Sequence, residues 1–285
     1  MKPGGRLAHL RFPPWLREIL LVLGVFAVYD LTRGLSRGSI AAAVDRGNAI
    51  LHGERVLHLA PEQWLDGELH QLTPLAVGAA YYYSTLHFVV TPAVLVWLYR
   101  SHRPHYASAR TWLAIASLVA LLGFCLLPVA PPRLLPGAGI HDVVAEVHRW
   151  GWWSDNSAAP RGLAGLTNEY AAMPSLHAGW ALWCGWLMLR HARHRAVRIA
   201  GVLYPVVTTL VILGTGNHYL LDAVVGLALV ALVGAGNGLV RRRVAAARAA
   251  TGPVRFATRR CHAVRPVAGR ATRAPAHPRV HRAEL

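Results

Sequence analysis

A histidine and an aspartate stand four residues apart in the segment from Gly214 to Asp222, where a long apolar stretch begins. If a helix starts near His218, this spacing places His218 and Asp222 on one helical face. A carboxylate beside an imidazole fixes the tautomer of the ring and stabilises its protonated form. The free ring nitrogen can then attack phosphorus. The pair therefore indicates nucleophilic catalysis, with a buried structural hydrogen bond as the alternative.

A second polar cluster, Pro174-Ser175-Leu176-His177, opens another apolar stretch. Backbone N–H groups at the start of a helix can bind an anion, and we expect Ser175 and His177 at such a start. Pro174 suits the first helical turn, where a missing N–H has no cost. Asn217, next to His218, either binds phosphate or caps the helix that follows.

Six apolar segments are predicted to be transmembrane helices, since about 20 helical residues cross the hydrocarbon layer. They are residues 15–31, 75–99, 111–130, 171–189, 197–213 and 219–240. The chain is 54% apolar and 15% charged, which excludes an ordinary soluble domain, where about 25% of residues are charged. The sequence thus predicts an all-α integral membrane protein with a catalytic domain of six transmembrane helices over residues 15–240.

The positions of arginine predict the orientation of these helices. The short loops 100–110 and 190–198 contain seven Arg and no acid, whereas segments 32–74 and 131–170 together contain seven Arg and nine acids. We therefore expect both short loops and both termini in the cytoplasm, and both polar clusters at the outer face. Because His177 then shares a face with the His–Asp pair, a merely structural pair is the less favoured interpretation.

The two outer segments are predicted to differ in structure. Between residues 33 and 74, apolar residues recur at helical spacing among charged ones, which is typical of one or two amphipathic helices on the bilayer surface. The segment 131–170 is rich in Pro and Gly and contains Trp150, Trp152 and Trp153. These tryptophans are favoured as interfacial anchors over substrate contacts.

Most of the net charge of +17 lies in a basic tail. Residues 241–285 contain 12 Arg and one acid, Glu284, and carry +11 of this charge. The tail is predicted to be mostly disordered and, like the N-terminal residues 1–14, cytoplasmic. It either binds anionic lipid headgroups or is a solvated segment that fixes the topology, and nucleic-acid binding is disfavoured.

At the two polar clusters the sequence resembles the type-2 phosphatidic acid phosphatase superfamily, which also contains the vanadium haloperoxidases. The second signature of that superfamily, Pro-Ser-Gly-His, is similar to Pro174-Ser175-Leu176-His177. Its third signature ends in His-x-x-x-Asp, which is matched by His218 through Asp222. The resemblance covers roughly residues 70–240. Within the superfamily, the chain is similar to the membrane branch that includes fungal inositol phosphorylceramide synthases and their bacterial relatives.

This resemblance implies a phosphoryl transfer in two steps. His218 would be the nucleophile that forms a phosphohistidine, and Asp222 would orient it. His177 would protonate the leaving alcohol and then deprotonate the acceptor, which is either water or the hydroxyl of a polyol or a lipid. Ser175 would bind a phosphate oxygen. No metal or other cofactor is implied, and the three cysteines show no metal-ligand spacing.

Two phosphate-binding signatures of the superfamily are incomplete in this chain. The third signature has an Arg six residues before its histidine, where this chain has Ile212, and the first, Lys-x6-Arg-Pro, has no full match. Arg103-Pro104 lacks the Lys and lies in a predicted inner loop. Arg133, at the outer end of the third apolar segment, is the expected replacement, since a guanidinium can clamp a phosphate with two hydrogen bonds. Arg161 is either a second clamp or a surface residue.

Other polar residues near the outer face are weaker candidates. Tyr83 and His87, with the two tyrosines before Tyr83, form either a pocket for the substrate headgroup or an interhelical hydrogen-bond network, which is favoured. Tyr170, with the two residues before it, is expected at the rim of the pocket. His141 and His148 are interpreted as ordinary loop residues.

Together these features predict an enzyme of the bacterial cytoplasmic membrane with its active site at the outer face. Its substrate is expected to be a lipid phosphate or phosphodiester. Hydrolysis and headgroup transfer both stay open, and the missing Arg and Leu176 in place of Gly favour transfer. The alternatives are a transporter-like protein that uses His218–Asp222 as a proton relay, although no inverted repeat is visible, and a non-catalytic relative. The sequence does not indicate the oligomeric state.

Overall fold

The chain divides into two compact units, residues 1–243 and 244–285. The computed structural model describes, apart from four single positions before residue 40, residues 40–155, 161 and 168–250. These four positions apart, the first predicted apolar segment, residues 15–31, lies outside the described residues. The N-terminal residues 1–14 and the tail beyond residue 250 also lie outside them. Of the second unit, only the end of the last helix is described.

The described residues form eight α-helices and no strand, which confirms the predicted all-α class for this part of the chain. The helices are α2 (Ile40–Val56), α3 (Pro61–Gln71), α4 (Thr73–Ser101), α5 (Arg103–Leu126), α6 (Val143–Glu146), α7 (Leu176–His191), α8 (Arg195–Gly214) and α9 (Leu220–Ala250). Two short 3-10 turns, η1 (Pro132–Leu134) and η2 (His148–Trp150), lie between α5 and α7. The amphipathic pattern predicted between residues 33 and 74 corresponds to α2 and α3.

Four of these helices are long and apolar enough to cross a membrane, namely α4, α5, α8 and α9 over residues 220–247. They correspond to four of the six predicted segments and support membrane association. The segment predicted over residues 171–189 is helix α7, whose 16 residues are fewer than the about 20 that a span needs. Six transmembrane helices therefore stay a prediction.

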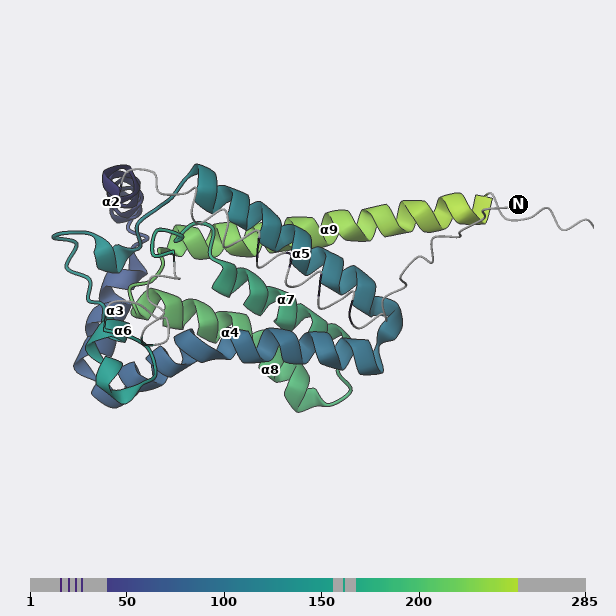
Figure 1. Cartoon of the computed structure of the whole chain (residues 1–285), viewed down its shortest axis with the longest axis horizontal. Helices are drawn as coiled ribbons and strands as arrows, with labels where there is room; N and C mark the ends of the chain where they lie inside the picture. Colours follow the sequence, from purple (N-terminus) through teal and green to yellow (C-terminus); the bar gives the residue numbers. More distant parts are fainter. Residues whose placement is uncertain are drawn as a thin grey trace, which may run out of the picture. The chain divides into compact units, whose positions relative to one another are not determined.

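The apolar helices pack side by side (Figure 1). α7 lies against α8 and α4, while α2, α3 and α6 gather at one end of the bundle. Apolar side chains from α4, α5, α7 and α9 form its core: Val94, Leu98, Ala109, Trp112, Ala116, Trp183, Cys184, Leu187 and Val230. The Trp112 indole N–H donates to the carbonyl of Val230 at 2.6 Å, which fixes α5 against α9.

The segment between α5 and α7 is folded against the end of the bundle. Val129 pairs with Ala171 in an isolated parallel bridge, so the chain is extended where the third predicted segment was expected to continue to residue 130. Trp153 is fully buried, and its indole N–H donates to the carbonyl of Val144 at 2.8 Å. The interpretation of Trp153 as an interfacial anchor is therefore wrong, whereas Trp150 is 54% exposed.

Candidate active site

His218 and Asp222 are in contact at the start of α9. His218 Nδ1 lies 3.3 Å from Asp222 Oδ2, and the same oxygen accepts the backbone N–H of Tyr219 at 3.1 Å. α9 begins at Leu220, so His218 precedes the helix and does not share a helical face with Asp222. The contact comes from helix capping instead, because an acidic side chain at the third helical position accepts the N–H of the capping residue.

This pair is shielded from solvent, since Asp222 is fully buried and His218 is 4% exposed. Contact with the carboxylate places the ring proton of His218 on Nδ1, which leaves Nε2 free to act on a substrate. The second carboxylate oxygen, Asp222 Oδ1, is buried without a hydrogen-bond partner among the described residues.

Ser175 joins α7 to this pair. Its Oγ accepts the N–H of Ala178 at 3.4 Å and caps the helix, while its own N–H donates to the Asp222 carbonyl at 3.0 Å. α7 begins one residue after Ser175, so Pro174 precedes the cap and does not occupy the first turn. The N–H of His177 is among the first-turn groups that have no partner within their own helix. The two polar clusters thus meet through their backbones.

Glycines allow α7 and α9 to approach this closely. A Cβ atom on Gly226 would overlap the carbonyl oxygen of Ser175, and one on Gly179 would lie 2.9 Å from Val230 Cγ2. The imidazole rings of His177 and His218 lie 5.6 Å apart, inclined at 62°. Backbone packing rather than side-chain rotamers therefore sets the spacing of the two helix starts that carry the histidines.

Two residues of α4 surround His177. The Tyr83 ring stacks on it with a centroid distance of 4.6 Å, and the His87 ring meets it edge-on at 4.4 Å. Together with Ile212 and neighbouring tyrosines and a threonine, these rings enclose a cavity of about 10 Å³, which has room for at most about one water. The structure thus brings Tyr83 and His87 to His177, whereas Tyr170 packs elsewhere, in the cluster around Val129.

Arg133 lies against the loop between α8 and α9. Its backbone N–H donates to the Gly216 carbonyl at 2.9 Å, and its Nε donates to Asn217 Oδ1 at 3.0 Å. Its guanidinium also forms an ion pair of 2.5 Å with Asp142 and lies 3.8 Å from Glu169. With its side chain 7% exposed, the guanidinium already has two carboxylates beside it. A phosphate would have to share these contacts or displace them.

The structure also shows the contacts of three further residues that the sequence singled out, Asn217, Arg161 and Ile212. Asn217 donates through Nδ2 to the carbonyl and hydroxyl oxygens of Thr215, both at 3.1 Å, so it binds Arg133 and Thr215 and does not cap α9. Arg161 donates to the backbone carbonyls of His148, Gly151 and Trp153, which makes it a loop-stabilising residue in this structure. Ile212 is buried in the wall of the His177 cavity and supplies no charge there.

The family model described as the PAP2 superfamily matches residues 48–235, more than half of the chain. The chain belongs to the PAP2 superfamily. PAP2 proteins are generally phosphatases or phosphotransferases, so membership supports an enzyme of this kind. No curated protein and no solved structure matches the chain.

Sequence reasoning missed three buried carboxylates within the PAP2 match, Glu54, Glu62 and Asp66. Burial raises the pKa of Glu54 to about 8 and also raises the pKa of Glu62 and of Asp66, although Asp66 accepts the N–H of His141 at 2.9 Å. The spacing of these residues could have indicated their burial. Glu54 follows the apolar Leu51 by three residues, and Glu62 and Asp66 are four residues apart, so in a helix each lies on the same face as buried neighbours.

His141 is also more than an ordinary loop residue. Its ring lies 2.8 Å from Asp66 Oδ1 and stacks on the ring of His70 at 3.8 Å. His70 in turn contacts Glu146 at 2.7 Å. This stacked pair fastens the segment after η1 to α3.

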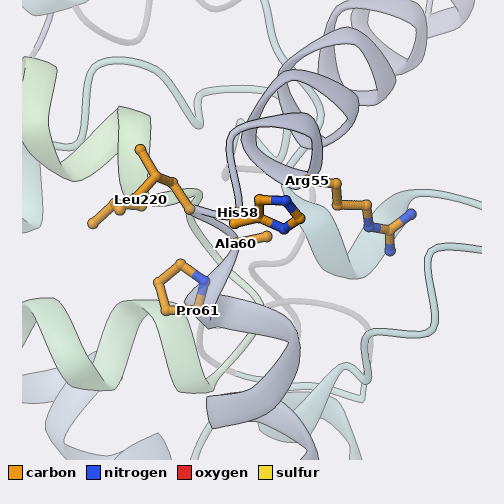
Figure 2. A pocket seen from close by; sticks show the side chains of 6 residues that line it. Arg55, His58, Ala60, Pro61 and Leu220 are labelled. Atoms are coloured by element: carbon orange, nitrogen blue, oxygen red, sulfur yellow. The ribbon is translucent and has the colours of Figure 1, made fainter.

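A surface pocket of about 430 Å³ opens between α2, α3 and α9. Its lining residues are Arg55, His58, Leu59, Ala60, Pro61 and Leu220. Figure 2 shows the Arg55 side chain pointing away from Leu220 and Pro61, and its guanidinium donates to Gln63 and to the Ala138 carbonyl. Leu220, which lines this pocket, follows His218 by two residues in the chain.

Proposed function

We propose that this PAP2 protein is a membrane lipid phosphatase or phosphotransferase that acts on a lipid phosphate or phosphodiester headgroup. The observation that carries the proposal is the junction of the two helix starts, where Ser175 binds Asp222 and the His177 ring meets the His218 ring. Four helices that can cross a membrane favour a substrate that is itself anchored in lipid.

In the first step, Nε2 of His218 attacks the phosphorus atom. The new P–N bond forms as the bond from phosphorus to the leaving oxygen breaks, and His177 gives its proton to that oxygen. The phosphohistidine ring carries a positive charge, which the Asp222 carboxylate stabilises at the 3.3 Å contact with Nδ1. The products are a lipid with a free hydroxyl and a phosphorylated enzyme.

In the second step, His177 takes a proton from the acceptor. The acceptor oxygen attacks phosphorus, the P–N bond breaks, and His218 regains its lone pair. Water as acceptor gives hydrolysis. A polyol or lipid hydroxyl gives a phosphomonoester when the donor is a lipid phosphate, and a new phosphodiester when the donor is a phosphodiester. Both histidines then have their starting protonation states.

We assign the phosphate oxygens to Ser175, the first-turn N–H groups of α7 and Arg133. A helix start favours an anion through its unpaired N–H groups. Arg133 is the cation that we assign, because Ile212 brings no charge and Arg133 binds Asn217, the neighbour of His218. Asn217 completes this set through its contact with Arg133.

The number of spans, their orientation and the type of transfer are proposed from the sequence. We propose six spans with both termini in the cytoplasm of a bacterium, and an active site at the outer face of the membrane. Leu176 and Ile212, where phosphatases of the superfamily have Gly and Arg, favour an inositolphosphotransferase-like activity over simple hydrolysis.

The test is incubation of purified protein with a panel of phospholipids and prenyl phosphates, with and without free inositol. Free phosphate without an acceptor identifies a phosphatase, and a new phosphodiester identifies a transferase. His218→Ala and His177→Ala should each reduce the rate about a hundredfold or more, and the exposed His52→Ala on α2 serves as control. Full activity in both active-site variants contradicts the mechanism.

The transporter-like alternative makes a different prediction. Protein in sealed vesicles would then move protons in a manner that depends on His218 and Asp222, without turnover of any lipid phosphate. This result would replace the proposed enzyme with a proton relay.

A further inference from the structure

Two glutamates from α2 and α3 pack against the start of α9. Glu62 is fully buried and Glu54 is 7% exposed. Glu54 Oε1 accepts the backbone N–H of Leu221 at 2.6 Å, one residue before Asp222. This N–H belongs to the first turn of α9 and has no partner within the helix. Glu54 thus satisfies a helix-start donor directly beside the candidate dyad.

The other oxygens of the two glutamates require a proton. Glu54 Oε2 and both oxygens of Glu62 are buried and have no donor among the described residues, and the two carboxyl groups interact with each other. Ionised carboxylates only accept hydrogen bonds, so a proton on one of the two groups would supply the donor that these oxygens lack. Burial of acceptors without a donor therefore favours one shared proton on the pair.

The surrounding charges favour the same state. Asp222 on α9 faces both glutamates, and Tyr219 just before α9 faces all three carboxyls. Arg55 is the cation that acts on Glu62, but its guanidinium is bound to Gln63 and Ala138. His218 is paired with Asp222 itself. Since like charges disfavour a further ionisation, a second negative charge on the pair is opposed.

We infer that Glu54 and Glu62 are positioning residues, whose shared proton lets α2 and α3 hold the start of α9 so that Asp222 can orient His218. The chain of contacts is continuous, from Glu62 to Glu54, from Glu54 to the Leu221 N–H, and from the next residue to His218. Loss of the proton places a second negative charge on the pair, beside Asp222, and weakens the contact that holds the start of α9. The inference rests on the proposed function.

The direction of the pH effect follows from burial. Burial raises the pKa of Glu54 from 4.5 to about 8, and it raises the pKa of Glu62 as well. Unfolded carboxyls release their protons near pH 4.5, so the folded state loses stability relative to the unfolded chain as the pH rises from about 4.5 to about 8. Above about pH 8 this loss is complete, and the transfer rate should fall near that pH.

The decisive variant is Glu62→Gln, because an amide imitates a protonated carboxyl and cannot ionise. We expect it to keep the neutral-pH rate within about threefold and to lose the fall near pH 8, whereas Glu62→Ala should lose about tenfold or more through misplacement of Asp222. Glu68→Gln removes an exposed carboxylate from the same helix and should keep the wild-type pH profile.

A second measurement does not depend on turnover. Infrared spectra of the full-length protein should show the C=O stretch of a protonated carboxylic acid that disappears as the pH rises through about 8. Glu62→Gln should move this titration to lower pH, because it removes a carboxyl group that raises the pKa of Glu54. An unchanged pH–rate profile in Glu62→Gln, or the absence of the titrating band from the wild-type protein, overturns the inference. If the band titrates and depends on Glu62 but no lipid phosphate turns over, the proposed function fails while the shared proton is supported.

Discussion

Replacement of Gly226 by alanine should separate the two candidate histidines. The added methyl group would overlap the carbonyl oxygen of Ser175 and lie 3.0 Å and 3.1 Å from its carbonyl carbon and nitrogen. These are backbone atoms, so no side-chain rotation can relieve the overlap. The start of α7 must move by roughly 1 Å to restore ordinary carbon contacts, and it carries Ser175 and His177 with it.

Two opposed contributions set the change in the free energy of unfolding of Gly226→Ala. Alanine in place of glycine inside a helix stabilises by about 1 kcal/mol. Overpacking costs about 1–3 kcal/mol, and the upper end applies because the contact is with backbone. We expect a net loss of about 2 kcal/mol in the free energy of unfolding. The rate should fall about a hundredfold, the effect of misplacing a catalytic group by about 1 Å.

Gly236→Ala is the matched control in the same helix, since a Cβ atom there meets nothing within 4 Å. It should be about 1 kcal/mol more stable than the wild type and fully active. Denaturant unfolding in detergent and lipid-phosphate turnover measure both quantities for each variant. If Gly226→Ala matches Gly236→Ala in stability and rate, the close approach of α7 and α9 does not set the geometry of the site.

Three further predictions concern residues around the site. Trp153→Ala should lower the free energy of unfolding by about 3–5 kcal/mol, since it removes a fully buried ring; a loss below about 1 kcal/mol, the scale of a surface change, would contradict this burial. Arg133→Lys should not rescue the activity lost in Arg133→Ala, because an ammonium cannot reproduce the planar contacts to Asn217 and Asp142; equal rates for Lys and Arg would contradict this. Gly47→Ala should destabilise the protein, because its Cβ would lie 2.7 Å from the Tyr219 hydroxyl, whereas Gly53→Ala meets nothing within 4 Å; thermal unfolding of both variants compares them.

The sequence predicted the components of the candidate site better than their arrangement. His177, His218 and Asp222 were identified by residue type and spacing, and the structure brings all three together. The four-residue spacing of His218 and Asp222 was interpreted as a helical face, but the same spacing also fits a capping contact that begins just before a helix. Local sequence does not distinguish these two geometries, because the first helical residue depends on how α9 packs.

Buried polar residues were the main omission. Glu54 and Glu62 stand among charged and apolar residues of an amphipathic pattern, where a carboxylate is ordinarily solvated. Glu54 binds the N–H of Leu221, which lies far along the chain. Trp153 packs in a cluster with side chains of α3, α4 and α6, and composition alone could not pair it with them. Long-range packing, rather than residue type, decided each of these cases.

The hydrogen bond from Leu221 to Glu54 joins residues 167 positions apart. During synthesis, α2 and α3 emerge long before α9, so Glu54 cannot bind the Leu221 N–H until that last helix is made. Closing such a long loop early would bring an entropic cost without the contacts that offset it. The candidate site therefore depends on the last described helix, and a chain truncated before residue 218 would lack both His218 and Asp222.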